Sequence, residues 1–278
     1  MFEPVIKWSG SKRSQAEEIL KNIPKEISVY YEPFCGGCSV LRRLLYEVEQ
    51  NENRVDKFVC SDLNSDLIAL WNLIKSDYSS ISTYYEILWE ELNVDDDCER
   101  KKAYFESVRC RLNKEHNPKD FMFIMRTTTN GMPRYNKKGD FNNSFHITRN
   151  GIIPNKLDKI LSEWSKVLNK FDVVFNCCTY EDVLSAENDF MYLDPPYANT
   201  KGMYMGAINC DSFFEWLKKQ KGGYCFSFDG ISGSVNNTVN VPTDVFSEHK
   251  YLFSGNSSFK RTIGKSNDSI VYESLYLK

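Results

Sequence analysis

The fold is decided by residues 190–197, FMYLDPPY, a short apolar run that stops at an acidic residue followed by two prolines. Proline cannot donate a hydrogen bond to a sheet, so a strand through this run must end at Asp194. Its end would present the Asp194 carboxylate, the Pro195 carbonyl and the Tyr197 ring in one small volume. Two acceptors beside an aromatic face suit a planar group that carries an amino substituent. The alternative is a rigid exit from the strand, in which Tyr197 only packs.

Other short apolar runs also end in polar residues, at 29–32, 57–62 and 172–175. Segments with helical periodicity lie around them, at 14–23, 39–50, 65–75 and 211–219. Strands that alternate with helices predict a parallel α/β sheet. Open sheets of this kind bind ligands beyond the carboxyl ends of their strands, so polar side chains at those ends are candidate site residues.

The composition is that of an ordinary globular chain, with 41% hydrophobic and 26% charged residues among 278. This length predicts one large domain or one domain with an insertion. No run approaches the ~18–20 apolar residues of a membrane helix, and the first residues lack a signal-peptide pattern. We therefore expect a cytoplasmic protein with no membrane partner.

The nine cysteines are an odd number, which favours free thiols over a disulfide framework. Cys35 and Cys38 form a C-x-x-C, so a zinc or redox site is one hypothesis. A second such pair is missing from the sequence, and its three histidines are scattered singly. We favour small core side chains around a glycine turn and predict no metal.

The net charge of −3 hides an uneven distribution. Residues 89–99 hold six acidic residues and no basic one, whereas 121–151 hold five basic residues and one acid, a local +4. Between about 71 and 154 charged helical segments, at 79–92 and 99–114, lead into the turn-rich sequence TTTNGMPRYN at 127–136. This pattern predicts an inserted module whose basic part could meet phosphates, with a solvated surface loop as the alternative.

Residues 31–40, YEPFCGGCSV, read as a strand end, a glycine turn and a helix start. The order is that of a dinucleotide fingerprint, but the third glycine is missing and Glu32 crowds the turn. A carboxylate there would repel a pyrophosphate, so a phosphate-free nucleoside cofactor fits better. Asp62 follows the next strand, where an acid holds ribose hydroxyls in nucleotide folds. Its alternative role is to cap a helix from about Ser65, together with Asn64.

Residues 7–13, KWSGSKR, place a glycine between two serines, so the backbone could approach a ligand closely. Trp8 could stack on that ligand, and Lys12 could bind a carboxylate or carbonyl. Taken alone, the segment is equally a flexible basic terminus.

Along the chain the four motifs are K-W-x-G-x-K at 7–12, E-P-F-x-G-G at 32–37, S-D-L-N-S-D-L-I at 61–68 and, after the insertion, D-P-P-Y at 194–197. In that order they resemble the Dam-like DNA adenine-N6 methyltransferases of the D12 class. The resemblance runs from Lys7 to about Lys278, and the tail 257–275 is similar to the family's closing strands. It implies an α/β fold, with a Rossmann-like SAM-dependent methyltransferase sheet and an inserted helical plus β-hairpin target-recognition domain. The catalytic domain would comprise 1–70 and 155–278, and the insertion 71–154.

The resemblance also implies a role for each motif residue. The residues that would bind S-adenosylmethionine are Trp8, Lys12, Glu32, Phe34, Gly36, Asp62 and Asp194, with Asp62 on the ribose hydroxyls. The catalytic set would be Asp194, Pro195, Pro196 and Tyr197, with Tyr197 stacked on the flipped base. The DNA contacts would come from Asn130, Met132, Arg134 and Asn136, with Met132 as an apolar wedge.

The implied activity is methyl transfer from S-adenosylmethionine to N6 of adenine in double-stranded DNA, by base flipping, at GATC or a related site. The family often continues F-N-V-P-F-G where this chain has FNNSFH at 141–146, so Ser144 replaces a proline beside a base. The implied partners are DNA and, in a restriction-modification system, a cognate endonuclease; we expect a monomer or weak dimer of bacterial or phage origin.

Three alternatives remain open on the sequence. The same D-P-P-Y chemistry serves cytosine-N4 and RNA amino-methyltransferases. A DNA-binding relative without turnover is a second alternative, which intact Lys12, Asp62 and Asp194 speak against. A nicotinamide oxidoreductase is the third, disfavoured by the missing glycine and by Glu32.

Overall fold

The structure is a computed structural model that describes residues 1–196, 208–256 and 270–278. Its strands form one sheet in the order β3-β2-β1-β4-β5-β8-β7, and the short β6 (Val235–Asn236) pairs with β5. The bounds are β1 Glu26–Pro33, β2 Arg54–Asp62, β3 Val173–Cys177, β4 Phe190–Leu193, β5 Gly223–Ser232, β7 Glu248–Asn256 and β8 Ile270–Leu277. β1 to β5 run parallel, whereas β8 is antiparallel to both β5 and β7. The four strands predicted from the sequence are therefore confirmed as β1 to β4.

Both faces of the sheet are covered, as β4 shows by its alternating side chains. Phe190 and Tyr192 enter a core cluster with α1 (Ala16–Leu20) and α2 (Ser39–Glu49), whereas Met191 and Leu193 enter a second cluster with α7 (Cys210–Leu217). Successive side chains of a strand point to opposite faces, so a strand buried on both sides is apolar throughout. This explains why 190–193 lacks polar residues.

The two helices predicted at 65–75 and 79–92 form one helix, α3 (Ser65–Leu92), with a break at Asp77 (φ −155°, ψ 68°). The Asp77 carboxylate accepts hydrogen bonds from the Ser79 hydroxyl (2.8 Å) and the Ser80 amide (3.2 Å), as a cap for the second half does. Before the break, Trp71 is fully buried and stacks on Phe175 of the sheet. The chain thus leaves the sheet region near Asp77.

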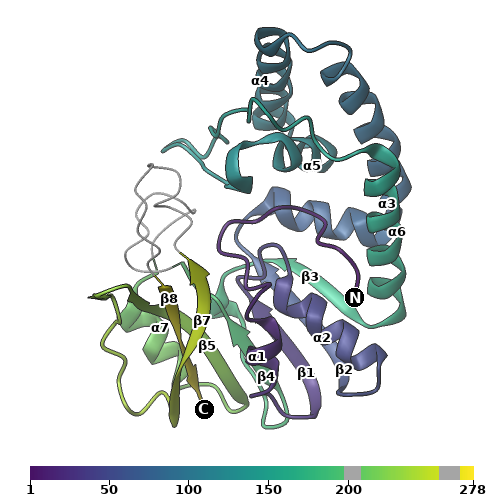
Figure 1. The fold of residues 1–278 in the computed structure, drawn as a ribbon. Helices are drawn as coiled ribbons and strands as arrows, with labels where there is room; N and C mark the ends of the chain where they lie inside the picture. Colours follow the sequence, from purple (N-terminus) through teal and green to yellow (C-terminus); the bar gives the residue numbers. More distant parts are fainter. Residues whose placement is uncertain (197–207, 257–269) are drawn as a thin grey trace.

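Figure 1 shows α4 (Cys98–Glu115) and α5 (Pro118–Thr127) at the end of the molecule away from the sheet, with α3 and α6 (Pro154–Lys170) running between the two parts. α5 and α6 were not predicted. α6 carries a clear signal, a proline in its first turn followed by apolar residues at helical spacing. No helix in the described ranges is both long enough and apolar enough to cross a bilayer.

A loop of residues 128–145, here called the 128–145 loop, follows α5. The predicted β-hairpin is present only as two isolated antiparallel bridges, Thr128 to Phe145 and Tyr135 to Phe141. Helix α4 holds the loop, because the Asn113 side chain donates to the Phe141 carbonyl (3.0 Å) and accepts from its amide (2.8 Å). Hydrogen bonds from side chains of the loop and of α4 hold this segment in place of the regular backbone hydrogen bonds of a hairpin.

Candidate active site

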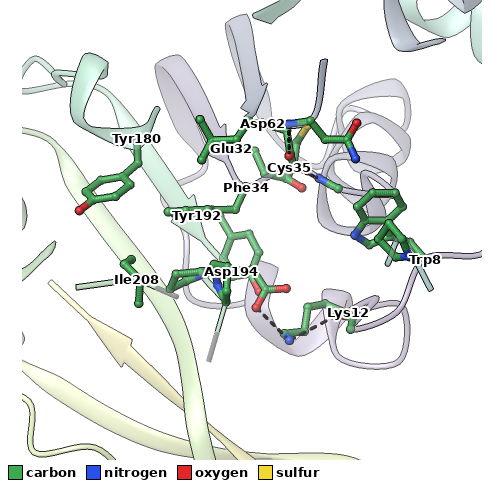
Figure 2. A pocket seen from close by; sticks show the side chains of 18 of the residues that line it. Trp8, Lys12, Glu32, Phe34, Cys35, Asp62, Tyr180, Tyr192, Asp194 and Ile208 are labelled. Carbon is green, nitrogen blue, oxygen red and sulfur yellow. Dashed lines mark hydrogen bonds and ion pairs between the residues drawn. The ribbon is translucent and has the colours of Figure 1, made fainter. Parts of the chain in front are cut away.

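A cavity of about 540 Å³ opens at the carboxyl ends of β1, β2, β3 and β4. The chain runs outward from β1 to β3 on one side of the sheet and from β4 to β5 on the other, so β1 and β4 flank the topological switch point where such sheets bind ligands. Its lining includes Trp8, Lys12, Glu32, Phe34, Cys35, Gly36, Asp62, Asn64, Pro133, Tyr135, Tyr180, Tyr192, Asp194, Pro195, Pro196, Ile208 and Ser212. The structure therefore brings all four predicted motifs together (Figure 2).

The turn between β1 and α2 winds tightly around the cavity. Phe34, Gly36 and Cys38 all have positive φ, at 68°, 47° and 53°. The Gly36 carbonyl accepts from the buried Trp71 indole (3.0 Å), and a Cβ on Gly36 would lie 2.5 Å from Nε1 of Trp8. Glycine is required here because Trp8 covers the turn at contact distance.

Asp62 is fixed by backbone donors. Its Oδ2 accepts from the Gly36 amide (3.1 Å) and its Oδ1 from the Asn64 amide (3.0 Å). Burial raises the pKa of Asp62, and these backbone hydrogen bonds counter part of that rise. Asn64 is the N-cap of α3, since its Oδ1 accepts from the Leu67 amide (3.0 Å). The capping role considered for Asp62 belongs to Asn64, which leaves the Asp62 carboxylate facing the cavity (Figure 2).

Glu32 is 3% exposed and accepts a hydrogen bond from the Tyr30 hydroxyl (2.8 Å). Burial raises the pKa of Glu32 to about 8, an effect that the bonds from Tyr30 and the Leu41 amide offset in part and the charge of Asp194 reinforces. Glu32 is therefore largely protonated near neutral pH, and a bound cation would favour its ionised form.

Lys12 links Asp194, directly after β4, to β8. Its Nζ lies 2.9 Å from Oδ1 of Asp194 and 3.1 Å from Oε2 of Glu273 in β8, and its side chain is 5% exposed. Burial disfavours the charged form, but the attraction of the two carboxylates outweighs it and raises the pKa of Lys12. The sequence predicted Lys12 as a cofactor contact; the structure places its ammonium between the two carboxylates, on the cavity wall.

Several lining residues were missed. Tyr180 follows β3 and packs against Phe34 (5.4 Å between ring centroids). Ile208 lies near Tyr180 on the same side of the cavity (Figure 2). The signal for Tyr180 was its place after the predicted strand at 172–175, the same rule that identified Asp62. Tyr197, predicted to stack on a base, lies outside the described residues.

The predicted DNA-contacting residues cluster in the 128–145 loop, and Arg134 and Asn130 are exposed there. Met132 is half-buried. Asn136 uses both side-chain ends inside a turn: Nδ2 donates to Asp140 (2.9 Å), and Oδ1 accepts from the Lys138 and Asp140 amides (2.8 and 3.0 Å). A contact of Asn136 with DNA stays a prediction, but the structure gives this residue a local role as well.

The basic segment 121–151 is not uniformly surface. Arg126 is turned inward, where its guanidinium donates to the Pro4 carbonyl (3.0 Å) and burial lowers its pKa to about 10. Lys137 and Lys138 are exposed with Arg134, so the outward positive charge concentrates in the 128–145 loop.

Cys35 and Cys38 are buried free thiols, and burial raises the pKa of both. Cys38 is the N-cap residue of α2 and has a left-handed conformation. Cys35 lines the cavity, and Cys38 ends the β1–α2 turn where α2 begins.

Comparison with known proteins gives a consistent result. A family model described as D12 class N6 adenine-specific DNA methyltransferase matches residues 8–213. Type II methyltransferase M.MjaIII of Methanocaldococcus jannaschii is 32% identical over 208 residues, 70% of this chain and 69% of that protein. Type II methyltransferase M.CviBI of Paramecium bursaria Chlorella virus NC1A is 30% identical over 207 residues, with the same coverage of 70% and 69%. The DNA adenine methylase of Escherichia coli (strain K12) is 28% identical over 199 residues, 69% of this chain and 64% of that protein.

Proposed function

Because this chain belongs to the D12 class N6 adenine-specific DNA methyltransferases, we propose that the cavity holds S-adenosylmethionine and a flipped adenine side by side. Membership of the class makes the chain an S-adenosylmethionine-dependent enzyme that methylates N6 of adenine in DNA. The observation that carries the residue assignment is that Asp194 and Pro195 line the same cavity as Asp62 and Glu32.

The residues present fit the cofactor. The volume of about 540 Å³ lies within the range of about 300–1,000 Å³ typical of ligand sites. Each carboxylate oxygen has more than one acceptor position, so Asp62 can accept from ribose hydroxyls while it holds the Gly36 and Asn64 amides. Phe34 and Tyr180 offer aromatic surface for the adenine ring of S-adenosylmethionine. Glu32 offers a carboxyl group for the ammonium of its methionine part. We also assign Trp8 to this site, since it covers Gly36.

S-adenosylmethionine, when bound, supplies an electrophilic methyl group. The amino lone pair of adenine is delocalised into its ring, so acceptors on both N–H bonds are needed to direct it at that group. Asp194 and the Pro195 carbonyl are the acceptors, held at the end of β4 by the rigid D-P-P sequence. Asp194 is also the nearest base for the proton that the amino group loses. Pro196 keeps the segment extended, and Tyr197 would stack on the base.

A base inside a duplex cannot enter this cavity, so the adenine must leave the stack, which costs a few kcal/mol. The 128–145 loop borders the cavity through Pro133 and Tyr135 and presents Met132, Arg134 and Asn130 beside it. Met132 is the wedge that fills the vacated stack, and Arg134 contacts a base edge or phosphate.

We assign 71–154 to target recognition and 1–70 with 155–278 to catalysis, with the break at Asp77 as the point where the chain leaves the catalytic part. The DNA substrate is double-stranded, and the site is GATC or a related sequence, with Ser144 as the position where recognition departs from that of relatives. The cell compartment is the cytoplasm. A cognate endonuclease and a monomeric or weakly dimeric state belong to the same proposal.

The decisive experiment is incubation with methyl-labelled S-adenosylmethionine and unmethylated duplex DNA, followed by nucleoside analysis and mapping of the labelled positions. We expect N6-methyladenine in one short sequence context. Asp194→Ala should lose at least about 100-fold in transfer rate, the scale for removal of one preorganised electrostatic group, while DNA binding survives. Label in N4-methylcytosine or in RNA alone would replace the proposal with its rival, and near-normal turnover by Asp194→Ala would remove that residue from the mechanism.

A further inference from the structure

Glu273 lies far from every motif in the sequence, yet it completes the ion cluster at the catalytic aspartate. Its Oε2 lies 3.1 Å from Nζ of Lys12, the same ammonium that holds Asp194 at 2.9 Å. Its other oxygen, Oε1, accepts a hydrogen bond from the Ser254 hydroxyl (3.0 Å). Both ends of the carboxylate are thus held, one by a lysine from the N-terminus and one by a serine from β7.

Each strand that flanks β8 has a register shift near Glu273. The β5–β8 register shifts between Phe228 and Ile231, opposite Glu273. Gly230 fits this shift only without a side chain, because a Cβ there would lie 2.1 Å from the Tyr272 carbonyl oxygen. On the other side Glu273 pairs with Leu252, and the β7–β8 register shifts between Phe253 and Gly255. The extra residue of that shift is Ser254, whose hydroxyl bonds to the Glu273 carboxylate, and such irregularities re-aim side chains beside active sites.

The charges show what Glu273 adds. Glu273 adds one negative charge beside the Lys12–Asp194 ion pair. The adenine amino nitrogen becomes positive as it gains the methyl group, so a further negative charge near Asp194 favours that state over the initial one. In a site as little exposed as this one, the effect of one charge is larger than in water.

We propose that Glu273 is a positioning residue for methyl transfer: it anchors Lys12 from β8 and adds a negative charge beside the Lys12–Asp194 pair that favours the transfer. Glu273 acts through Lys12 and is not among the lining residues of the cavity. This inference rests on the proposed function, in which Asp194 receives the adenine amino group.

The test compares Glu273→Gln, which keeps the shape and removes the charge, with Glu273→Asp, which keeps the charge. Single-turnover transfer at saturating S-adenosylmethionine and DNA should fall about 10- to 100-fold for Glu273→Gln and less for Glu273→Asp. The dissociation constants for both ligands should stay within about threefold, the sign of an interaction that matters mainly in the transition state. The control is Glu215→Gln, which removes an exposed ion pair with Lys218 on α7 and should change none of these values.

Ser254→Ala keeps Lys12, Asp194 and Glu273 ionised and removes only the hydroxyl bond to Oε1, so it tests the anchor without a change of buried charge. We expect a rate loss of about two- to fivefold, smaller than that of Glu273→Gln, because the ion pair with Lys12 remains. A saturating rate equal to wild type in Glu273→Gln would overturn the inference, as would a rate loss matched by equal losses of ligand affinity and thermal stability. A wild-type protein that binds S-adenosylmethionine but transfers no methyl group to DNA would instead overturn the proposed function.

Discussion

The cavity and the 128–145 loop hold their functional side chains in different ways. In the cavity, Asp62, Glu32 and Lys12 each have hydrogen-bond or ion-pair partners that hold their charged groups in place. In the loop, Arg134 is exposed, and among the described residues it has no recorded side-chain partner. The hydrogen bonds that hold the loop connect parts of its own backbone or connect it to α4. The Asn143 side chain, for example, donates to the Thr129 and Met132 carbonyls (2.9 and 3.0 Å).

The tasks proposed for the two regions account for this difference. Methyl transfer needs groups whose geometry and charge are set before the substrate arrives, because reorganisation during the reaction adds to the barrier. Base recognition needs side chains that can reach a groove, so they lie on a surface and gain their partners from DNA. A substitution in the cavity should therefore act on the bound geometry, and one in the loop on sequence choice.

Gly36→Ala should give the largest loss of cofactor affinity, because the added methyl group distorts the lining of the cavity. The new Cβ would lie 2.5 Å from Nε1 of Trp8 at a residue with φ +47°. Trp8 must move or the turn must change, and the amide that Gly36 donates to Asp62 moves with it. We expect S-adenosylmethionine affinity, measured by calorimetry, to fall at least about 100-fold, which is about 2.8 kcal/mol.

Gly139→Ala is the matched control. Gly139 also has positive φ, +88°, but nothing lies within 4 Å of its added Cβ, and it sits in the 128–145 loop. The left-handed conformation costs alanine about 1–2 kcal/mol at either position. If Gly139→Ala weakened cofactor binding as much as Gly36→Ala, backbone strain alone would account for both and the contrast between the two regions would fail.

Arg134→Ala tests the loop. An arginine that makes a bidentate contact to a base contributes about 1–3 kcal/mol of discrimination, so methylation of sites altered at one base pair should rise relative to the preferred site. Cofactor affinity should not change, since Arg134 does not line the cavity. Specificity constants on a panel of singly substituted duplexes measure this.

Lys138→Ala, in the same loop, serves as the comparison for Arg134→Ala. A lysine that meets only phosphate should weaken binding to all duplexes alike and reduce its salt dependence. A uniform loss in Arg134→Ala as well would assign Arg134 to the DNA backbone instead of to a base.

The sequence predicted the residues whose position follows from local rules. Asp62, Glu32 and Asp194 each end or closely follow an apolar run, and parallel strands bring such ends to one edge. The chain's family followed from the order of those motifs. The break of α3 was also predictable, as two helical patterns separated by polar residues at 76–78.

What could not be predicted depends on distant parts of the chain. Glu273 meets Lys12 across more than 250 positions of sequence, in a stretch of β8 where the register with β5 shifts. The turn that Asn136 makes with Asp140 depends on a loop conformation that composition does not specify, and a DNA contact of Asn136 stays a prediction. The hydrogen bond between Asn64 and the Tyr135 hydroxyl joins residues 71 positions apart, and no local sequence pattern predicts it.

Tyr135→Phe tests the junction between the two regions and should give the smallest effect. The Tyr135 hydroxyl accepts from the side-chain Nδ2 of Asn64 (2.6 Å). The backbone N–H of the same Asn64 donates to Asp62. Phenylalanine keeps the ring against Phe141 and removes only this bond, worth about 0.5–1.5 kcal/mol. We expect S-adenosylmethionine affinity to fall about two- to tenfold. The factor by which DNA changes that affinity should also move toward one, and by linkage so should the effect of the cofactor on DNA affinity.

Tyr85→Phe is the control, because it also removes a buried hydroxyl, one that bonds to the Ile152 backbone in the inserted part and does not line the cavity. Tyr85→Phe removes two hydrogen bonds and should lose at least as much thermal stability, but only Tyr135→Phe should alter cofactor titrations made with and without DNA. Equal coupling in wild type and Tyr135→Phe would mean that the two regions act independently across this contact. Reduced coupling would identify the Tyr135–Asn64 bond as the point where the exposed loop acts on the preorganised cavity.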